Sequence, residues 1–131
     1  MDKIYINGGK PLHGEITVPG DKSISHRSVM AVILAQDVCR VENIPDISDV
    51  TMMIRILHQL GAKITKVDAN TYDIDSSTIN SYVVSHDMTK HLRASYYLIG
   101  SLLARFGRAK VAMPGGCNFG VRPLDQHIKG F

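Results

Sequence analysis

The 131-residue sequence has no tryptophan and only two cysteines. Cys39 and Cys117 are too few for the disulfide framework of a small secreted domain, and we expect a reducing, cytoplasmic compartment. The chain shows no signal-peptide pattern and no apolar run long enough to span a bilayer, so we expect no membrane partner. The six histidines are spread out, without an H-x-x-x-H pair near a carboxylate, and we expect no metal site.

Charge is also modest. The net charge of +3 comes from 15 Lys and Arg against 12 Asp and Glu, and the basic residues are scattered. Because no basic stripe carries interleaved aromatics, we expect no nucleic-acid partner, and an anionic small molecule fits better. A hydrophobic content of 44% with 21% charged residues is typical of a folded domain.

The most distinctive stretch is a glycine-rich loop at 114–123, with the sequence PGGCNFGVRP. Its glycines permit positive φ or a close approach to a ligand, and Pro123 opens a predicted helix at 124–130. The thiol of Cys117, the cation of Arg122 and a nearby helix N-terminus together favour a thiolate and a bound anion. The alternative is a turn that carries a small, buried and inert cysteine, and spacing alone leaves both open.

A second candidate anion site lies at 19–28, with the sequence PGDKSISHRS. Lys22, Ser23 and Arg27 surround the start of a predicted apolar helix at 28–35, where backbone N–H groups and the helix dipole favour anions. The G-x-x-x-x-G-K pattern of a Walker A loop is absent. The alternative is a solvated basic helix start without a ligand.

The apolar patterns predict an α/β chain with short strands and amphipathic helices. Strands are expected at 3–6, 15–18, 38–44, 62–67, 71–75, 81–84 and 108–113, and helices at 28–35, 50–60, from 87 or 89 to 103, and 124–130. Ser23 or Ser25 is the expected cap of the first helix, and Ser48 or Asp49 that of the second. The fourth and fifth strands read as a hairpin.

The order of these elements repeats along the chain. In both halves a helix start that bears an arginine is followed by an apolar helix, a strand, a proline-bearing loop and a helix that ends in glycine. The period is roughly 68 residues, which indicates a duplicated α/β unit rather than a short solenoid repeat. The matched positions are Arg27 with Arg93, Pro45 with Pro114, and Gly61 with Gly130. The strands after Gly61 have no counterpart after Gly130, so the second copy looks cut short.

With both loops and the duplication, the chain resembles the enolpyruvyl transferases. The resemblance runs nearly end to end and includes MDKIYINGGKPLHGEI, IPDISDVTMMIRILHQLGAKI and HLRASYYLIGSLLARFGRAKVAMPGGCNFGVRPLDQHIKGF. The longer match favours the branch whose acceptor is UDP-N-acetylglucosamine. It implies transfer of the enolpyruvyl group of phosphoenolpyruvate to the acceptor's 3′-hydroxyl, with release of phosphate, as the first committed step of peptidoglycan synthesis. This chemistry needs no cofactor.

The resemblance also implies roles for individual residues. Cys117 would donate a proton to the methylene carbon of phosphoenolpyruvate, form a covalent adduct and be alkylated by fosfomycin. Phosphoenolpyruvate would be bound by Lys22, Ser23 and Arg122. The residues facing the UDP-sugar would be Arg93, Arg122, Pro123, Leu124, Asp125 and Gln126.

The loop at 19–28 departs from that branch. Ser23 stands where the UDP-sugar branch usually has Asn, and Arg27 has no counterpart there. The stretch resembles instead the 3-phosphoshikimate 1-carboxyvinyltransferases, in which the Lys, Ser and Arg of this loop bind phosphoenolpyruvate and shikimate 3-phosphate. A shikimate-branch transferase, with Arg27 as an anion contact, is therefore the second hypothesis, and a non-catalytic, truncated α/β module is the third.

The resemblance implies a protein longer than this chain. In this family each of two domains is an inside-out barrel of three βαβαββ units, and the active site lies between the domains. Residues 1–20 would be the first strands, which belong to the other domain, and 21–131 would form about two repeats of a partial inside-out α/β barrel. We expect such a fragment to be inactive alone and to self-associate through its uncovered sheet edge and helix face.

Overall fold

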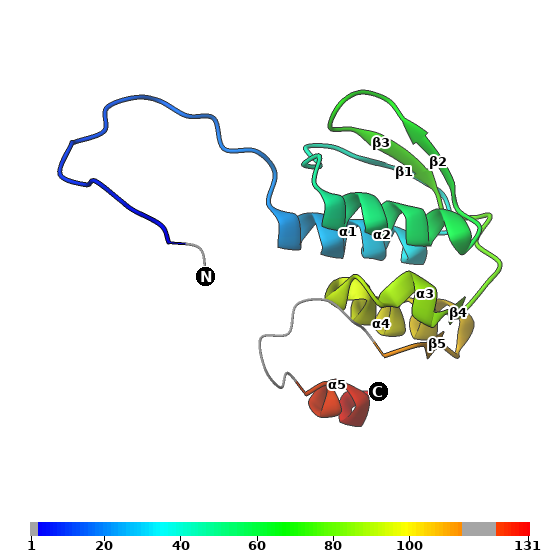
Figure 1. The fold of residues 1–131 in the computed structure, drawn as a ribbon. Helices are drawn as coiled ribbons and strands as arrows, with labels where there is room; N and C mark the ends of the chain where they lie inside the picture. The colour runs from blue at the N-terminus through cyan, green and yellow to red at the C-terminus, as the bar shows by residue number, and fades with distance from the viewer. Residues whose placement is uncertain (1–2, 114–122) are drawn as a thin grey trace.

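The computed structural model describes residues 3–113 and 123–131 and shows a mixed α+β fold with open sheets (Figure 1). The helices are α1 (Lys22–Ala35), α2 (Ser48–Gln59), α3 (His86–Thr89), α4 (Tyr97–Phe106) and α5 (Asp125–Gly130), with a 3-10 helix η1 (Arg93–Tyr96) before α4. The strands are β1 (Val38–Val41), β2 (Lys63–Lys66), β3 (Tyr72–Asp75), β4 (Val83–Val84) and β5 (Lys110–Val111). In the described ranges, no helix is long and apolar enough to cross a membrane.

Strands β1, β3 and β2 form an antiparallel sheet in that order, and the predicted hairpin is confirmed as β2–β3. A bidentate pair joins β1 to β3, because Arg40 donates from Nε and Nη2 to the two carboxylate oxygens of Asp73, each at 2.8 Å. Helices α1 and α2 cover one face of this sheet, where Ile74 is fully buried (Figure 1). Strands β4 and β5 form a separate parallel pair joined through α3, η1 and α4.

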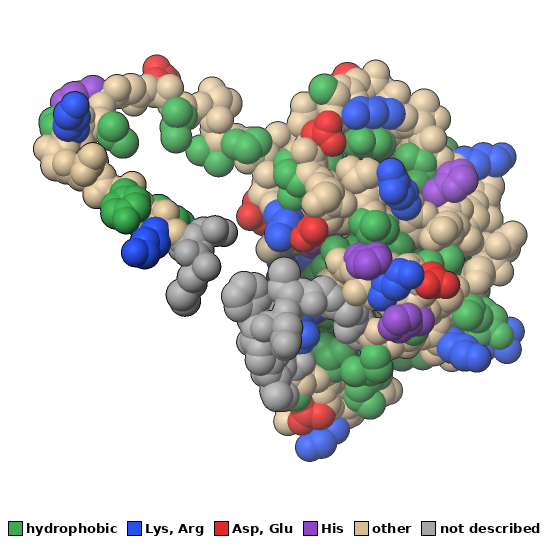
Figure 2. All heavy atoms as spheres, in the orientation of Figure 1, with side chains coloured by type: hydrophobic (Ala, Val, Ile, Leu, Met, Phe, Trp, Pro, Cys, Tyr) green, Lys and Arg blue, Asp and Glu red, His purple; other side chains and the backbone are tan. Residues whose placement is uncertain are grey.

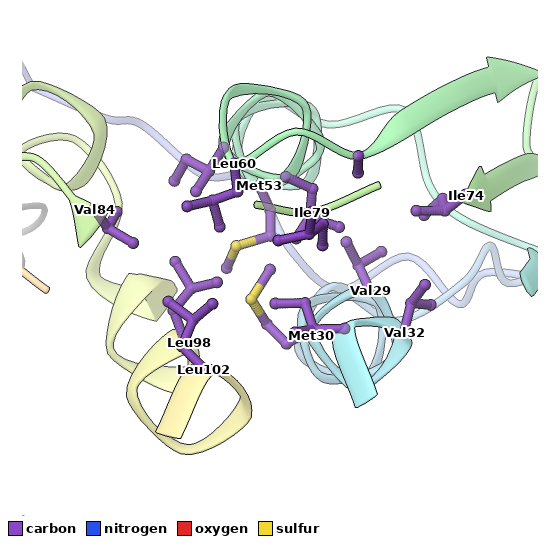
Figure 3. Packing of buried hydrophobic residues seen from close by; sticks show 14 of the residues in the cluster. Val29, Met30, Val32, Met53, Leu60, Ile74, Ile79, Val84, Leu98 and Leu102 are labelled. Carbon is purple, nitrogen blue, oxygen red and sulfur yellow. The ribbon is translucent and has the colours of Figure 1, made fainter. Parts of the chain in front are cut away.

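The core lies between helices α1, α2 and α4. Met30 from α1, Met53 from α2, and Leu98 and Leu102 from α4 point toward one another, and each is at most 2% exposed (Figure 3). Helices α1 and α2 thus form a middle layer, with the three-stranded sheet on one side and α4 on the other (Figure 1). Burial of this apolar cluster supplies the main stabilisation of the fold.

Helices α1, α2 and α4 run parallel, so their N-termini lie at one end of the layer. Lys22 at the start of α1 reaches Asp49 at the start of α2. The guanidinium of Arg27 lies 5.2 Å from the ring centroid of Tyr97 at the start of α4. At the opposite end, Arg105 near the end of α4 donates to a carbonyl in the last turn of α1. The helix dipoles therefore point in the same direction.

The predicted start of the first helix is wrong. Helix α1 begins at Lys22 instead of residue 28, and its N-cap is Asp21, not Ser23 or Ser25. The Oδ1 atom of Asp21 accepts the backbone N–H of Ile24 at 2.7 Å. A carboxylate at this position also complements the helix dipole, which the two serines would do less well.

The long helix predicted to run to residue 103 is also wrong. Leu92 has an extended backbone (φ −135°, ψ 104°) and a buried side chain, so the chain leaves the helix there to fill the core. Helix α2 has Ile47 as its N-cap, without a side-chain hydrogen bond, instead of Ser48 or Asp49. Asp49 accepts Lys22 Nζ, which gives its carboxylate a different partner. The strands expected at 38–44, 81–84 and 108–113 are shorter than predicted.

Residues 3–20 form neither helix nor strand and extend away from the packed body (Figure 1). The strands expected at 3–6 and 15–18 are not formed, because no strand in the described ranges pairs with them. Apolar side chains are spaced along this arm (Figure 2), and Leu12 is 96% exposed. Gly20 ends the arm against the body, where a Cβ atom would lie 1.8 Å from the carbonyl oxygen of Asn43.

Candidate functional site

Three of the predicted binding residues lie at the end of the molecule where α1, α2 and α4 begin. Lys22 and Arg27 stand in the first two turns of α1, and Arg93 opens η1 directly before α4. The positive ends of three helix dipoles add to these three side-chain charges. We call Lys22, Arg27 and Arg93 the cationic end.

Arg27 and Arg93 both lie near the tyrosine pair Tyr96 and Tyr97. The rings of Tyr96 and Tyr97 have centroids 4.4 Å apart, and Arg27 lies over the Tyr97 ring. Burial raises the pKa of Tyr96, its hydrogen bond to Tyr97 raises it further, and the charges of Arg27 and Arg93 act in the opposite direction. Both guanidinium groups therefore lie near enough to the Tyr96 phenol for their charges to affect its pKa.

The ammonium of Lys22 forms an exposed ion pair. Its Nζ atom lies 2.9 Å from Asp49 Oδ2, with side chains that are 54% and 39% exposed. Exposed pairs of this kind contribute about 0–1 kcal/mol. An incoming anion can therefore compete with Asp49 for Lys22 at small cost.

Ser23 and Arg27 share one face of α1. Arg27 donates from Nη1 to the carbonyl oxygen of Ser23 at 3.1 Å, as four-residue spacing on a helix allows. Both side chains are exposed. The three residues of the 19–28 motif that were predicted to bind anions thus lie on the solvent side of the first turns of α1.

The backbone at the start of α1 is partly occupied. The N–H of Ile24 already donates to Asp21, and the hydroxyl of Ser25 donates to the carbonyl oxygen of Asp21 at 2.7 Å. The Asp21 carboxylate also offsets some of the positive dipole end. An anion at the start of α1 would therefore meet mainly the side chains of Lys22 and Arg27 and few free backbone N–H groups.

Helix α5 meets the cationic end through Tyr96. His127 approaches Tyr96 edge-on, with ring centroids 5.5 Å apart, and the Phe131 ring packs near Gly100 of α4. Of the predicted UDP-sugar residues at 123–126, Leu124 is half-buried and lines an apolar hollow of about 220 Å³ between α4 and α5. The other three, Pro123, Asp125 and Gln126, are exposed.

Two predicted site residues, Cys117 and Arg122, lie outside the described residues, and their roles stay predictions. Cys39 stands in β1 opposite Ile74 and is partly buried, as expected of a packing residue. In the described part of the chain, no group of three or more His, Cys, Asp or Glu side chains could hold a metal ion.

Sequence reasoning missed His26. Its side chain is 4% exposed, one helical turn beyond Lys22. Burial lowers its pKa below 6.5, Asp49 acts to raise it, and Lys22 and Arg27 act to lower it. The signal was present, because His26 stands four residues from both Lys22 and the core residue Met30, on the inner face of the helix.

Known proteins resemble this chain over nearly its whole length. The family model described as EPSP synthase (3-phosphoshikimate 1-carboxyvinyltransferase) matches residues 6–131. UDP-N-acetylglucosamine 1-carboxyvinyltransferase 2 of Clostridium acetobutylicum is 48% identical over 132 residues, which cover 100% of this chain and 31% of that protein. UDP-N-acetylglucosamine 1-carboxyvinyltransferase of Trichlorobacter lovleyi is 46% identical over 130 residues, 99% of this chain and 31% of that protein.

A solved structure is also similar. The enolpyruvyl transferase NikO from Streptomyces tendae matches with a TM-score of 0.60 and 28% sequence identity. The match covers 78% of this chain and 24% of that one. The chain thus spans 31% of the length of the curated relatives and a smaller part of the structural neighbour.

Proposed function

Because this chain belongs to the EPSP synthase family, we propose that its protein transfers the enolpyruvyl group of phosphoenolpyruvate to the 3′-hydroxyl of UDP-N-acetylglucosamine. Phosphate is released, and the reaction is the first committed step of peptidoglycan synthesis in the cytoplasm. The observation that carries the proposal is the cationic end, where Lys22, Arg27 and Arg93 meet the starts of parallel helices. Both substrates are anions, and such a site favours them.

Lys22 and Ser23 are assigned to phosphoenolpyruvate, together with Arg122. The exposed pair between Lys22 and Asp49 opens when the substrate arrives, and the ammonium then contacts the anion. Fixed cations stabilise the negative charge that grows on the departing phosphate without reorganising during the reaction.

Cys117 is assigned as the acid. Its thiol proton passes to the methylene carbon of phosphoenolpyruvate, and the sugar hydroxyl oxygen adds to the neighbouring carbon, giving up its proton, to form a tetrahedral intermediate. Phosphate then leaves from that carbon and takes up the hydroxyl proton. The new methyl group returns one proton to the Cys117 thiolate, which restores the double bond of the enolpyruvyl ether. The thiol must keep its proton near neutral pH, so the acidifying effect of Arg122 has to be offset by the bound anions.

Arg93, Arg122 and the run 123–126 are assigned to the UDP-sugar. The contact between His127 of α5 and Tyr96, the last residue of η1, supports this assignment. Diphosphate recognition by Arg gives paired, charge-assisted hydrogen bonds.

The shikimate branch is the second candidate. Ser23 and Arg27 support it, because both are exposed on the first turns of α1, and so does the match to the EPSP synthase (3-phosphoshikimate 1-carboxyvinyltransferase) family. In that case Arg27 would contact shikimate 3-phosphate. The two acceptors differ in where they need a cation, so Arg27 separates the candidates.

The remaining architecture belongs to the same proposal. The chain would form part of an inside-out barrel of βαβαββ units, with residues 1–20 as strands of the other domain and 21–131 as about two units. The βαβ order of β4, α4 and β5 supports this. The exposed apolar arm also favours self-association, and a strictly monomeric mass in light scattering at high concentration would contradict that expectation.

The test is intact-mass spectrometry of this chain after incubation with fosfomycin, with and without UDP-N-acetylglucosamine. We expect one adduct, absent from a Cys117→Ala variant and retained in a Cys39→Ala variant, that forms faster with the nucleotide sugar. If the labelling rate does not depend on the nucleotide sugar, the assignment of UDP-N-acetylglucosamine as the acceptor is contradicted. A chain that stays unlabelled but binds shikimate 3-phosphate supports the second candidate. If this chain binds neither acceptor, the same experiment on the full-length protein decides, and absence of binding there identifies a non-catalytic module.

A further inference from the structure

Two buried polar atoms stand behind the cationic end without hydrogen-bond partners. They are His26 Nε2 and Ser95 Oγ, and in the described part of the chain no other buried side-chain nitrogen or oxygen lacks a partner. His26 is 4% exposed and Ser95 is 0% exposed. An unpartnered polar group is costly to bury, so two of them in one small region need an explanation.

The helix register places these two atoms in one layer of the core. Met30 of α1 and Leu98 of α4 point toward each other (Figure 3). One turn toward the N-terminus from Met30 is His26, and one turn back from Leu98 is Ser95. Because α1 and α4 run parallel, His26 and Ser95 form the next layer, directly inside the cationic end.

The chemistry of the two groups is complementary. The main chain of Asp49 acts to raise the pKa of His26, although burial lowers it overall. Burial disfavours the charged ring, and a neutral imidazole has one donor and one acceptor nitrogen, so Nε2 can serve as the acceptor. The Ser95 hydroxyl can donate a proton to it.

The segment that carries Ser95 is the one suited to move. Ser95 and Arg93 both belong to η1, a 3-10 helix that follows the extended Leu92. Short 3-10 segments have poorer hydrogen-bond geometry than α-helices, so a small shift of η1 breaks few strong bonds. A bound anion would attract Arg93 and the two cations of α1 to the same place, which draws η1 toward α1.

We propose that His26 and Ser95 are positioning residues whose mutual hydrogen bond, with Ser95 Oγ as donor and His26 Nε2 as acceptor, forms when η1 closes on α1 around a bound anion. The bond fixes Arg93 relative to Lys22 and Arg27, so the three cations face one ligand together. The inference rests on the proposed function, because phosphoenolpyruvate is taken as the anion.

The first test is nitrogen-15 NMR of the His26 ring as this chain is titrated with phosphoenolpyruvate. We expect the N–H on Nδ1 throughout and a shift of the Nε2 resonance toward the value of a hydrogen-bonded acceptor as ligand binds. In a Ser95→Ala variant this shift is lost. Binding that leaves Nε2 unchanged in the wild-type chain overturns the inference but leaves the proposed function standing.

The second test is a double-mutant cycle on the affinity for phosphoenolpyruvate. Ser95→Ala and His26→Leu should each weaken binding about 3- to 10-fold, and the double variant should be no weaker than the worse single variant. His26→Gln is the matched control, because its amide keeps an acceptor near the position of Nε2, and it should retain most of the affinity.

The cycle separates the two ways of failing. The pairing is overturned if the fold losses in affinity of the two single variants multiply in the double variant. It is also overturned if the single variants bind phosphoenolpyruvate as well as wild type does. Urea unfolding of each variant shows that the losses do not come from unfolded protein. A well-folded wild-type chain that binds no phosphoenolpyruvate removes the proposed function, and the positioning role falls with it.

Discussion

The two ends of the α1–α4 helix pair are held in opposite ways. At the C-terminal end, Arg105 bridges elements that lie far apart in the sequence by donating to four backbone carbonyls. Their residues and donor–acceptor distances are Ile33 (3.1 Å), Ser76 (2.6 Å), Ser77 (3.3 Å) and Ile79 (3.3 Å). At the N-terminal end, Lys22 and Arg27 are exposed and Arg93 is half-buried, the Lys22–Asp49 pair is weak, and two buried atoms lack partners.

We therefore expect stability to depend on one end of this helix pair and ligand binding to depend on the other. The closed end sets the register of α4 on α1, and that register decides which residues meet at the open end. Groups that are fully paired cannot contact a ligand without first breaking bonds, whereas loosely paired cations can. The closed end should therefore respond to substitution in unfolding experiments and the open end in binding experiments.

The largest effect is expected at the closed end. Replacing Arg105 with Ala should lower the free energy of unfolding by about 2–4 kcal/mol, because four carbonyls on two segments, α1 and the loop after β3, lose their shared donor. Urea denaturation measures this. Arg105→Lys is the control and should recover only part of the loss, since an ammonium lacks the planar fork. A loss below about 0.5 kcal/mol would contradict the assigned role.

At the open end, Lys22→Ala should weaken the binding of phosphoenolpyruvate about tenfold or more, because a charge-assisted contact to the anion is lost. Its free energy of unfolding should change by less than about 0.5 kcal/mol, since the pair with Asp49 is exposed. Isothermal titration and urea unfolding measure the two. Lys10→Ala, on the exposed arm, is the matched control and should alter neither. Equal affinities for Lys22→Ala and wild type would place the substrate elsewhere.

The open end should also be sensitive to acid. Burial lowers the pKa of His26 below the unfolded value of 6.5, with Asp49 opposing and Lys22 and Arg27 assisting. The unfolded state therefore binds the proton more readily, and stability is full above pH 6.5 and falls as the pH drops from 6.5 toward the folded pKa. Urea unfolding across this window should show the slope, and His26→Gln should abolish it. A slope that survives in the variant belongs to another group.

The smallest effect distinguishes the two acceptors. If the acceptor is UDP-N-acetylglucosamine, Arg27→Ala should reduce its affinity less than about threefold, because Arg27 is held over Tyr97 and adds only to the general field. If the acceptor is shikimate 3-phosphate, the same change should cost about tenfold or more through a lost direct contact. Isothermal titration with each acceptor measures both, and Arg40→Ala, paired with Asp73 on the sheet, is the control.

Local patterns were sufficient where an element depends on its own residues. The apolar spacing of Val50, Met53 and Leu57 predicted α2, and all three are buried. Gly61 was expected to stop that helix, and it lies directly beyond the C-cap with φ of +109°. The β2–β3 hairpin was equally local, since its two strands are neighbours in the sequence.

Predictions failed where the deciding partner is distant. The break before η1 follows from the burial of Leu92 in a core built by other elements. The arm at 3–20 has the alternation of strands, yet a strand needs a partner, and none is present in the described ranges.

The candidate site divides in the same way. Lys22, Arg27 and Arg93 could be named from residue type and position at helix starts. Their relation to Tyr96 and the ion pair of Lys22 with Asp49 could not be predicted from the sequence, because both depend on the register between α1, α2 and α4. Contact between elements is set by packing, and a linear pattern does not encode it directly.

The contact of Gly20 with the carbonyl of Asn43 has a consequence for mutational tolerance. A side chain at this position would have to displace the turn that holds Asn43 and Pro45, and the first residues of α1 would move with it. Gly8 and Gly14, on the same arm, have no atom within 4 Å of a built Cβ. A library that varies all three positions should therefore return almost only glycine at 20 and many residue types at 8 and 14. Tolerance to substitution thus differs sharply between positions of the same arm.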